Sequence, residues 1–128
     1  MVRYAVIGYG LAGATFHAPV ISATPGAELA AVVVRSADAA ARVRTTYPDV
    51  SIVGDVTGLS DLQIDAGVVA TPNDTHADVA TELLESGIAA VVDKPLAATA
   101  AEARALVDLA EVRGVALTCY QNRRWDGD

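Results

Sequence analysis

Short apolar runs recur along the whole chain, and stretches with the spacing of amphipathic helices separate them. The runs are rich in Val, Ile and Ala, which is typical of strands buried on both faces of a parallel sheet. Strands are predicted at residues 4–7, 29–34, 50–53, 64–70, 88–92 and 115–119.

The segments between these runs are predicted as helices, bounded by residues that start or stop a helix. Pro48, Gly87 and Gly114 end three of them, and Thr99 with Glu102 forms a capping box at the start of the last. Helices are predicted at residues 11–23, 38–47, 71–85 and 99–113, and a loop with one helical turn at 54–61. This alternation predicts an α/β fold, a Rossmann-type doubly wound parallel sheet of about six strands with flanking helices.

Length, charge and cysteine content narrow the class of protein. The chain has 128 residues, enough for one domain, and its net charge of −7 argues against nucleic acid or an anionic membrane as a partner. It has no signal-peptide pattern and no apolar run long enough to cross a bilayer. Cys119 is the single cysteine. These features predict a cytoplasmic protein, and no metal site is expected.

The first strand leads into a glycine-rich loop. Gly8, Gly10 and Gly13 have the spacing G-x-G-x-x-G between a strand and a helix, as in dinucleotide-binding folds. There the first glycine permits a tight turn, the second lets the backbone approach a pyrophosphate, and the third lets helix and strand pack closely. The alternatives are a glycine-rich turn in another α/β protein, or the nucleoside loop of a methyltransferase.

Ligands of such sheets bind beyond the carboxyl ends of the strands, so the loop after the second strand is informative. A carboxylate at this point would accept the ribose hydroxyls of NAD, but Arg35 and Ser36 stand there instead. A guanidinium can pair with a 2′-phosphate, which predicts a preference for NADP over NAD. The alternative is an exposed Arg35, with Asp38 binding the ribose.

Two further loops carry candidate binding groups. After the fourth strand, Asn73 and His76 lie one helical turn apart, where an amide and an imidazole can meet a ribose or nicotinamide. After the fifth strand, Lys94 lies between Asp93 and a proline that restricts its backbone. Lys94 can hydrogen-bond a substrate hydroxyl and help to move its proton. The alternative is a surface ion pair.

The first helix carries one more candidate. His17 lies about one and a half turns into it. Its side chain is either a partly buried helix histidine or a contact to the ligand, and the sequence does not distinguish the two.

Taken together, these motifs resemble the Gfo/Idh/MocA oxidoreductases, the group of glucose–fructose oxidoreductase and inositol dehydrogenase. The resemblance covers nearly the whole chain, and Asp93-Lys94-Pro95 matches the family's Glu-Lys-Pro signature with Asp for Glu. The other matching segments, in chain order, are Gly8-Tyr9-Gly10-Leu11-Ala12-Gly13, Phe16-His17-Ala18-Pro19, Ala70-Thr71-Pro72-Asn73 with His76, and Asn122-Arg123-Arg124-Trp125.

The resemblance implies an NAD(P)-dependent dehydrogenase or reductase that acts on a sugar, polyol or related carbonyl compound. The family's catalytic lysine would be Lys94, which binds the substrate and assists proton transfer. The expected cofactor is NADP, or else NAD. Combined with the residue-level analysis, the resemblance predicts cofactor contacts from Gly8, Gly10, Leu11, Ala12, Gly13, Arg35, Ser36, Ala70, Thr71, Pro72, Asn73, His76, Asp93, Lys94, Asn122, Arg124 and Trp125.

Family members continue into a second domain that supplies the substrate pocket, and this chain lacks it. Residues 1–119 are therefore predicted to be the nucleotide-binding domain, and 120–128 the start of the connection to the missing domain. We expect little or no turnover from the chain alone, and self-association through apolar surface around Tyr120 and Trp125.

Two other functions use the same glycine loop. A non-catalytic module that binds or senses NAD(P) would keep the loop but would not need Asp93-Lys94. A nucleoside-dependent transferase would normally place a carboxylate after the second strand, where Val34-Arg35 stands.

Overall fold

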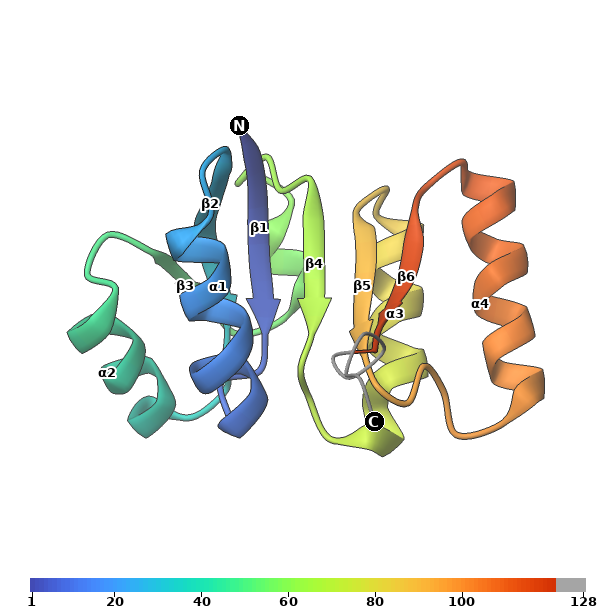
Figure 1. Ribbon diagram of the computed structural model, residues 1–128, viewed down its shortest axis with the longest axis horizontal. Helices are drawn as coiled ribbons and strands as arrows, with labels where there is room; N and C mark the ends of the chain where they lie inside the picture. The colour runs from blue at the N-terminus through green and yellow to red at the C-terminus, as the bar shows by residue number, and fades with distance from the viewer. Residues whose placement is uncertain (122–128) are drawn as a thin grey trace, which may run out of the picture.

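The computed structural model describes residues 1–121, which form a six-stranded parallel sheet with helices on both faces (Figure 1). The α/β doubly wound fold predicted from the sequence is confirmed. The strands are β1 (Val2–Ile7), β2 (Ala27–Val33), β3 (Ser51–Val53), β4 (Ala66–Val69), β5 (Ala89–Asp93) and β6 (Leu117–Tyr120).

The strand order is β3-β2-β1-β4-β5-β6, which puts β1 and β4 at the centre of the sheet. The last residue of β1, Ile7, pairs with Val33 on one side and with Val69 on the other. The chain leaves β1 toward one half of the sheet and leaves β4 toward the other half. A crevice therefore opens between the carboxyl ends of β1 and β4, where ligands of this fold class bind.

Alternate residues of each central strand enter opposite layers of the core. Val6, Val32 and Val68 pack under α1 (Ala18–Ala23) and α2 (Ala37–Thr46). The opposite face of the sheet packs against α3 (His76–Glu85) and α4 (Ala100–Arg113), which contribute Leu83, Leu84 and Leu106. The short helical turns are η1 (Gly13–His17), η2 (Val56–Leu59) and η3 (Asn73–Thr75).

The first helix departs from the regular α-helix expected over residues 11–23. Residues Gly13–His17 form a π-helical turn, in which the amide of Ala18 donates to the Gly13 carbonyl five residues back. Pro19 explains the wider turn, because it has no N–H for the Thr15 carbonyl and its ring would crowd that carbonyl in an α-helix. Wide turns of this kind change where the neighbouring side chains point.

Only one of the two hydrogen bonds expected for the capping box of α4 forms as predicted. Thr99 Oγ1 accepts from the Glu102 amide at 3.1 Å, as predicted. The Glu102 carboxylate reaches the amide of Ala98, at 3.1 Å, instead of the amide of Thr99. Gly114 ends the helix with φ +64°, a left-handed conformation that glycine adopts without strain.

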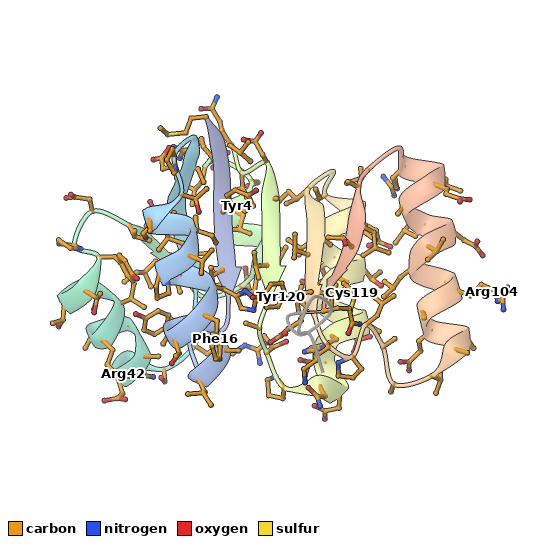
Figure 2. All side chains as sticks on the ribbon, viewed as in Figure 1. Tyr4, Phe16, Arg42, Arg104, Cys119 and Tyr120 are labelled. Carbon is orange, nitrogen blue, oxygen red and sulfur yellow. The ribbon has the colours of Figure 1, made fainter. Side chains whose placement is uncertain are left out.

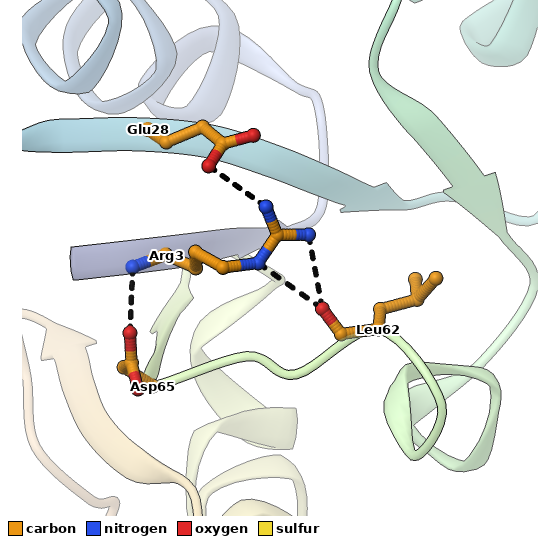
Figure 3. Close-up of polar contacts among 4 residues, drawn as sticks. All are labelled: Arg3, Glu28, Leu62 and Asp65. Carbon is orange, nitrogen blue, oxygen red and sulfur yellow. Dashed lines mark hydrogen bonds and ion pairs between the residues drawn. The ribbon is translucent and has the colours of Figure 1, made fainter. Parts of the chain in front are cut away.

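At the edge of the sheet opposite the crevice, Arg3 ties three segments together (Figure 3). Its guanidinium donates to Glu28 on β2 at 2.7 Å and to the Leu62 carbonyl at 3.0 and 3.2 Å, while its amide donates to Asp65 at 2.8 Å. These bonds fix the amino ends of β1, β2 and β4 relative to one another. They lie at the other end of the strands from the crevice, so they affect the crevice only indirectly.

Candidate functional site

Two cavities lie at the carboxyl edge of the sheet, one on each side of the glycine loop. The larger, of about 490 Å³, lies toward β2, and the smaller, of about 340 Å³, lies toward β5. Gly10 and Pro72 line the first, which we call the β2-side cavity, and Ala12 and Asn73 line the second, the β5-side cavity. The same two loops therefore form both cavities, which together make a continuous edge for an extended ligand.

The three glycines of the loop have different physical roles. Gly8 has φ +97°, and a Cβ there would lie 2.7 Å from the Ala70 carbonyl oxygen. A Cβ at Gly13 would collide with the Gly8 carbonyl. At Gly10 a Cβ would meet no protein atom within 4 Å. Gly8 and Gly13 thus permit close packing of the loop, whereas Gly10 leaves room beside the β2-side cavity.

Arg35 and Ser36 both line the β2-side cavity, whereas Asp38 is not among its lining residues. Ser36 caps α2, because its hydroxyl accepts from the Ala39 amide at 3.0 Å. The side chain of Asp38 is 90% exposed and pairs with Arg42 at 3.5 Å. The arrangement favours Arg35 and Ser36, rather than Asp38, as the groups that face a ligand.

Arg42 and Asp55 are among the lining residues of the β2-side cavity that were not singled out from the sequence. Arg42 lies over the ring of Tyr9, 5.5 Å from its centroid, and donates to the Tyr9 carbonyl at 3.4 Å. The available signal was its position on the helix α2, which directly follows Arg35 and Ser36. Asp55 follows the third strand at the same sheet edge, in a loop that the sequence showed only as polar.

The carboxylate of Asp55 has an unusual environment for an exposed group. The Thr57 hydroxyl donates to it at 2.5 Å and the Gly58 amide at 3.2 Å. These hydrogen bonds, with a smaller contribution from the charge of Arg35, lower the pKa of Asp55 from its usual value of 3.8. Asp55 is thereby kept as an anion close to Arg35.

The β5-side cavity brings together Asn73, Asp93 and Lys94, as the sequence placed them at one sheet edge. The Lys94 amide donates to Asp93 Oδ1 at 3.0 Å, and the Lys94–Pro95 peptide bond is cis. Within residues 1–121, Lys94 forms no ion pair. Asp93 and Lys94 therefore do not form the surface ion pair that was the alternative.

Asp93 pairs instead with His17, across a distance of 3.6 Å between Oδ2 and Nε2. His17 is only 7% exposed, and Tyr120 lies edge-on to its ring with a centroid separation of 4.8 Å. Figure 2 labels Phe16, the neighbour of His17 in the chain, and Tyr120 at the end of β6. His17 and Tyr120, like Phe16, line the β5-side cavity, so His17 is both a buried residue and part of the candidate site.

His76 was expected to contact a ligand, but its side chain lies inside the protein. It is 1% exposed and lines neither cavity. Its ring nitrogens lie 2.7 Å from the Pro95 carbonyl oxygen and 2.9 Å from the Thr71 carbonyl oxygen. Both nitrogens therefore contact the protein itself, and His76 joins the loop after β4 to the loop after β5.

The other residues singled out from the sequence have different environments. Thr71 lines the β2-side cavity, whereas Ala70 contributes the carbonyl against which Gly8 packs. The side chain of Leu11 is 79% exposed and belongs to neither cavity. Tyr120, expected as part of an exposed apolar surface, is half-buried against His17. The expected contacts of Asn122, Arg124 and Trp125 lie outside the described residues.

Two further features of residues 1–121 concern membranes and metal ions. No helix in this range has the length and apolar character needed to cross a bilayer. Nor does this range contain a group of three or more His, Cys, Asp or Glu side chains placed to hold a metal ion.

The strand order, the glycine loop and the position of the cavities define a Rossmann-type dinucleotide-binding domain. Residues 2–121 match the family model described as "Oxidoreductase family, NAD-binding Rossmann fold", GFO_IDH_MocA. The chain belongs to the Gfo/Idh/MocA family of oxidoreductases, of which it represents the N-terminal NAD-binding domain.

Individual relatives agree with this assignment. The chain is 46% identical to the oxidoreductase YdgJ of Escherichia coli and 30% identical to scyllo-inositol 2-dehydrogenase (NADP(+)) IolW of Bacillus subtilis. Each match covers 99% of this chain, but only 36% and 35% of the respective relative. A crystal structure of an NAD-binding protein from Listeria innocua superposes with a TM-score of 0.90 at 28% identity, covering 98% of this chain and 36% of that one. The chain thus spans about a third of the length of these relatives.

Proposed function

We propose that this chain is the nucleotide-binding part of an NAD(P)-dependent oxidoreductase that acts on the CH–OH group of a sugar, a polyol or a related carbonyl compound. The observation that carries the proposal is the position of Lys94. It lines the β5-side cavity together with Asn73, next to the glycine loop, and pairs with no carboxylate of residues 1–121. A binding or sensing module would have no need of a free amine there.

The β2-side cavity would hold the adenosine half of the cofactor. Its shape fits a nucleotide, because Gly10 leaves open space at the cavity wall and two guanidinium groups, those of Arg35 and Arg42, lie on the same side. Arg35 and Ser36 are the proposed partners of a 2′-phosphate, which makes NADP the preferred cofactor. The relative IolW carries NADP(+) in its name, in agreement with this preference.

The β5-side cavity would hold the nicotinamide end and the reacting carbon of the substrate. The bound nicotinamide supplies or accepts the hydride. Lys94 would hydrogen-bond the substrate oxygen at Nζ. As a neutral amine it would take the hydroxyl proton when the alcohol is oxidised, and as the resulting ammonium it would return that proton when the carbonyl is reduced. Asn73, which lines the same cavity, would orient the ribose or the carboxamide, and Asp93 accepts the Lys94 amide. Inositol dehydrogenases among the relatives make a sugar-like polyol a reasonable substrate class.

The complete enzyme would need the part that the relatives have and this chain does not cover. We propose that a second domain supplies the substrate pocket, that residues 120–128 begin the connection to it, and that the enzyme works in the cytoplasm. The chain alone would then show little or no turnover. It would self-associate at high concentration through exposed apolar surface, to which Leu11 and Phe16 would contribute.

Titration of the chain with NADPH and with NADH, followed by nicotinamide fluorescence, tests the proposal. Tighter binding of NADPH is expected. Binding of NADH alone would reverse the cofactor preference, and binding of neither nucleotide would overturn the proposal. Substrate-dependent oxidation of NADPH by the chain alone would contradict the need for a second domain, and a monomer in sedimentation at high concentration would contradict self-association.

A further inference from the structure

The chain contains two histidines, and both are buried. His76 has a carbonyl oxygen at each ring nitrogen, whereas His17 has a ring nitrogen without a hydrogen bond. Among the residues that the structure describes, His17 Nε2 is the one buried side-chain nitrogen or oxygen atom that lacks a hydrogen-bond partner. Native proteins seldom leave a buried polar atom unpaired, and such exceptions are concentrated at functional sites.

The charged group that His17 Nε2 faces is the carboxylate of Asp93, whose Oδ2 lies 3.6 Å away. The other oxygen, Oδ1, accepts the amide of Lys94 at 3.0 Å. The Asp93 side chain is 21% exposed, so the carboxylate is only partly in water. It thus lies between the His17 ring and the Lys94 backbone, with one oxygen directed to each.

This arrangement matters because Lys94 is the only lysine in the chain. An aspartate directly before an exposed lysine is well placed to pair with its ammonium, since opposite charges a few ångströms apart attract even near the surface. No such pair forms within the described range. The carboxylate that could neutralise Lys94 is turned toward His17.

We propose that His17 is a positioning residue: it holds the Asp93 carboxylate, and thereby leaves the Lys94 ammonium free to face the β5-side cavity. The inference rests on the proposed function, because it assigns His17 a role in preparing the amine that meets the substrate.

The fold gives His17 a fixed place for this role. The π-helical turn Gly13–His17, imposed by Pro19, sets the direction of the ring, and Tyr120 packs edge-on against it. Because His17 is 93% removed from solvent at the wall of the cavity, it can engage Asp93 without itself entering the space for the substrate.

The acylation rate of Lys94 by an amine-reactive ester tests the proposal, with the Met1 amine as an internal reference in the same mass spectrum. The reagent reacts only with a free amine, and no nucleotide or substrate is needed. In His17→Phe, which keeps a ring but no polar atom, the Asp93 carboxylate should turn to the ammonium and slow acylation of Lys94 about threefold or more. His17→Gln, whose side-chain amide is able to donate to Asp93, should restore the rate.

The carboxylate itself provides the second part of the test. In Asp93→Asn the Lys94 rate should not depend on whether residue 17 is His or Phe, because no carboxylate remains to be released. The matched control is Val20→Ala, a change on the same helix at a position that is 60% exposed and outside the cavity, and it should leave the rate unchanged. A slowing in His17→Phe that persists unchanged in the Asp93→Asn background would instead indicate a packing effect and overturn the proposal.

A spectroscopic measurement keeps the test decisive if His17→Phe does not fold. With only two histidines in the chain, each imidazole gives a resolved set of NMR signals. Asp93→Asn should shift the His17 ring signals, and unchanged signals would overturn the proposal. Failure of the nucleotide titration would refute the proposed function without affecting either measurement, so the two failures are distinguishable.

Discussion

The Nδ1 atom of His76 lies 2.7 Å from the carbonyl oxygen of Pro95, the residue that follows the candidate catalytic lysine. Its Nε2 atom lies 2.9 Å from the Thr71 carbonyl oxygen, in the loop that lines the neighbouring cavity. A neutral imidazole can donate to one of these carbonyls and an imidazolium to both. In either form, a buried ring connects the loop that carries Lys94 to the loop after β4, so the two halves of the site are positioned together.

His76→Ala should therefore both destabilise the protein and loosen the site. Loss of the buried ring leaves a cavity and removes a hydrogen bond, at a cost of about 2–4 kcal/mol in the free energy of unfolding. Urea unfolding measures this cost, and nucleotide titration measures the effect on the site. His76→Gln keeps one polar contact and should lose less. An unchanged unfolding midpoint in His76→Ala would contradict the bridging role.

The same substitution should affect different properties at the two glycines: stability at Gly13 and nucleotide binding at Gly10. A Cβ at Gly13 collides with backbone, so Gly13→Ala should destabilise the chain by about 1–3 kcal/mol. A Cβ at Gly10 meets no protein atom, so Gly10→Ala should fold with a stability within about 0.5 kcal/mol of the parent. It should nevertheless weaken nucleotide binding about tenfold, because backbone and phosphate no longer approach closely.

Each glycine variant serves as the control for the other. Thermal unfolding and nucleotide titration on both variants give the comparison. Equal loss of stability in the two variants would contradict the difference in packing between Gly10 and Gly13. Full nucleotide affinity in Gly10→Ala would show that Gly10 does not border the ligand.

Arg35→Ala should reduce NADPH affinity about tenfold to a hundredfold, and NADH affinity much less, because a charge-assisted pair with the 2′-phosphate is lost. The matched control is Arg104→Ala. Arg104 is an exposed arginine of α4 that lines neither cavity, and Figure 2 shows it at the edge of the molecule. Fluorescence titration of both variants with both nucleotides gives four affinities to compare. Unchanged NADPH affinity in Arg35→Ala would refute its role in cofactor preference.

The lowered pKa of Asp55 predicts that the free energy of unfolding depends on pH in the acid range. Its pKa is lower in the folded protein than the usual 3.8, chiefly through the Thr57 hydroxyl and the Gly58 amide, so the folded state binds the proton less readily than the unfolded chain. The stabilisation by Asp55 is therefore present above the unfolded pKa and is lost as the pH falls through the folded one.

The comparison of the parent with Asp55→Asn tests this sign. The parent should be the more stable at about pH 6, and the difference in unfolding free energy should shrink by about pH 2. Thr57→Ala, which removes the larger of the hydrogen bonds, should move the Asp55 titration, followed by carboxyl NMR shifts, back toward 3.8. A constant stability difference across this range would contradict the linkage.

Much of the fold was predictable from local patterns. The alternation of apolar runs and amphipathic stretches located the six strands, with boundaries that differ from the structure by a few residues. The capping residues Thr99 and Gly114 were correctly identified because caps depend on a residue and its immediate neighbours. The first helix differs because one proline, Pro19, alters the hydrogen bonds of the turn before it, and a helical period does not show that effect.

The sequence predicted which loops form the candidate site, but not which side chains in them contact one another. The rule that ligands bind at the carboxyl ends of parallel strands brought Arg35, Asn73 and Lys94 to one edge, and the cavities lie there. It did not reveal that Asp38 faces solvent or that Arg42 covers Tyr9, because side-chain direction on α2 depends on its packing against the sheet.

From local patterns, the amino-acid sequence by itself determined the α/β architecture and the loops in which chemistry is to be sought, because periodicity, glycine spacing and strand ends are properties of neighbouring residues. The family came from the resemblance of several motifs, among them Asp93-Lys94-Pro95. Only the tertiary structure decided the strand order and the roles of the two histidines, one joined to Pro95 and the other facing Asp93. The physical reason is that a buried polar side chain takes whatever partner the packing of distant segments brings to it, and no local pattern specifies that partner.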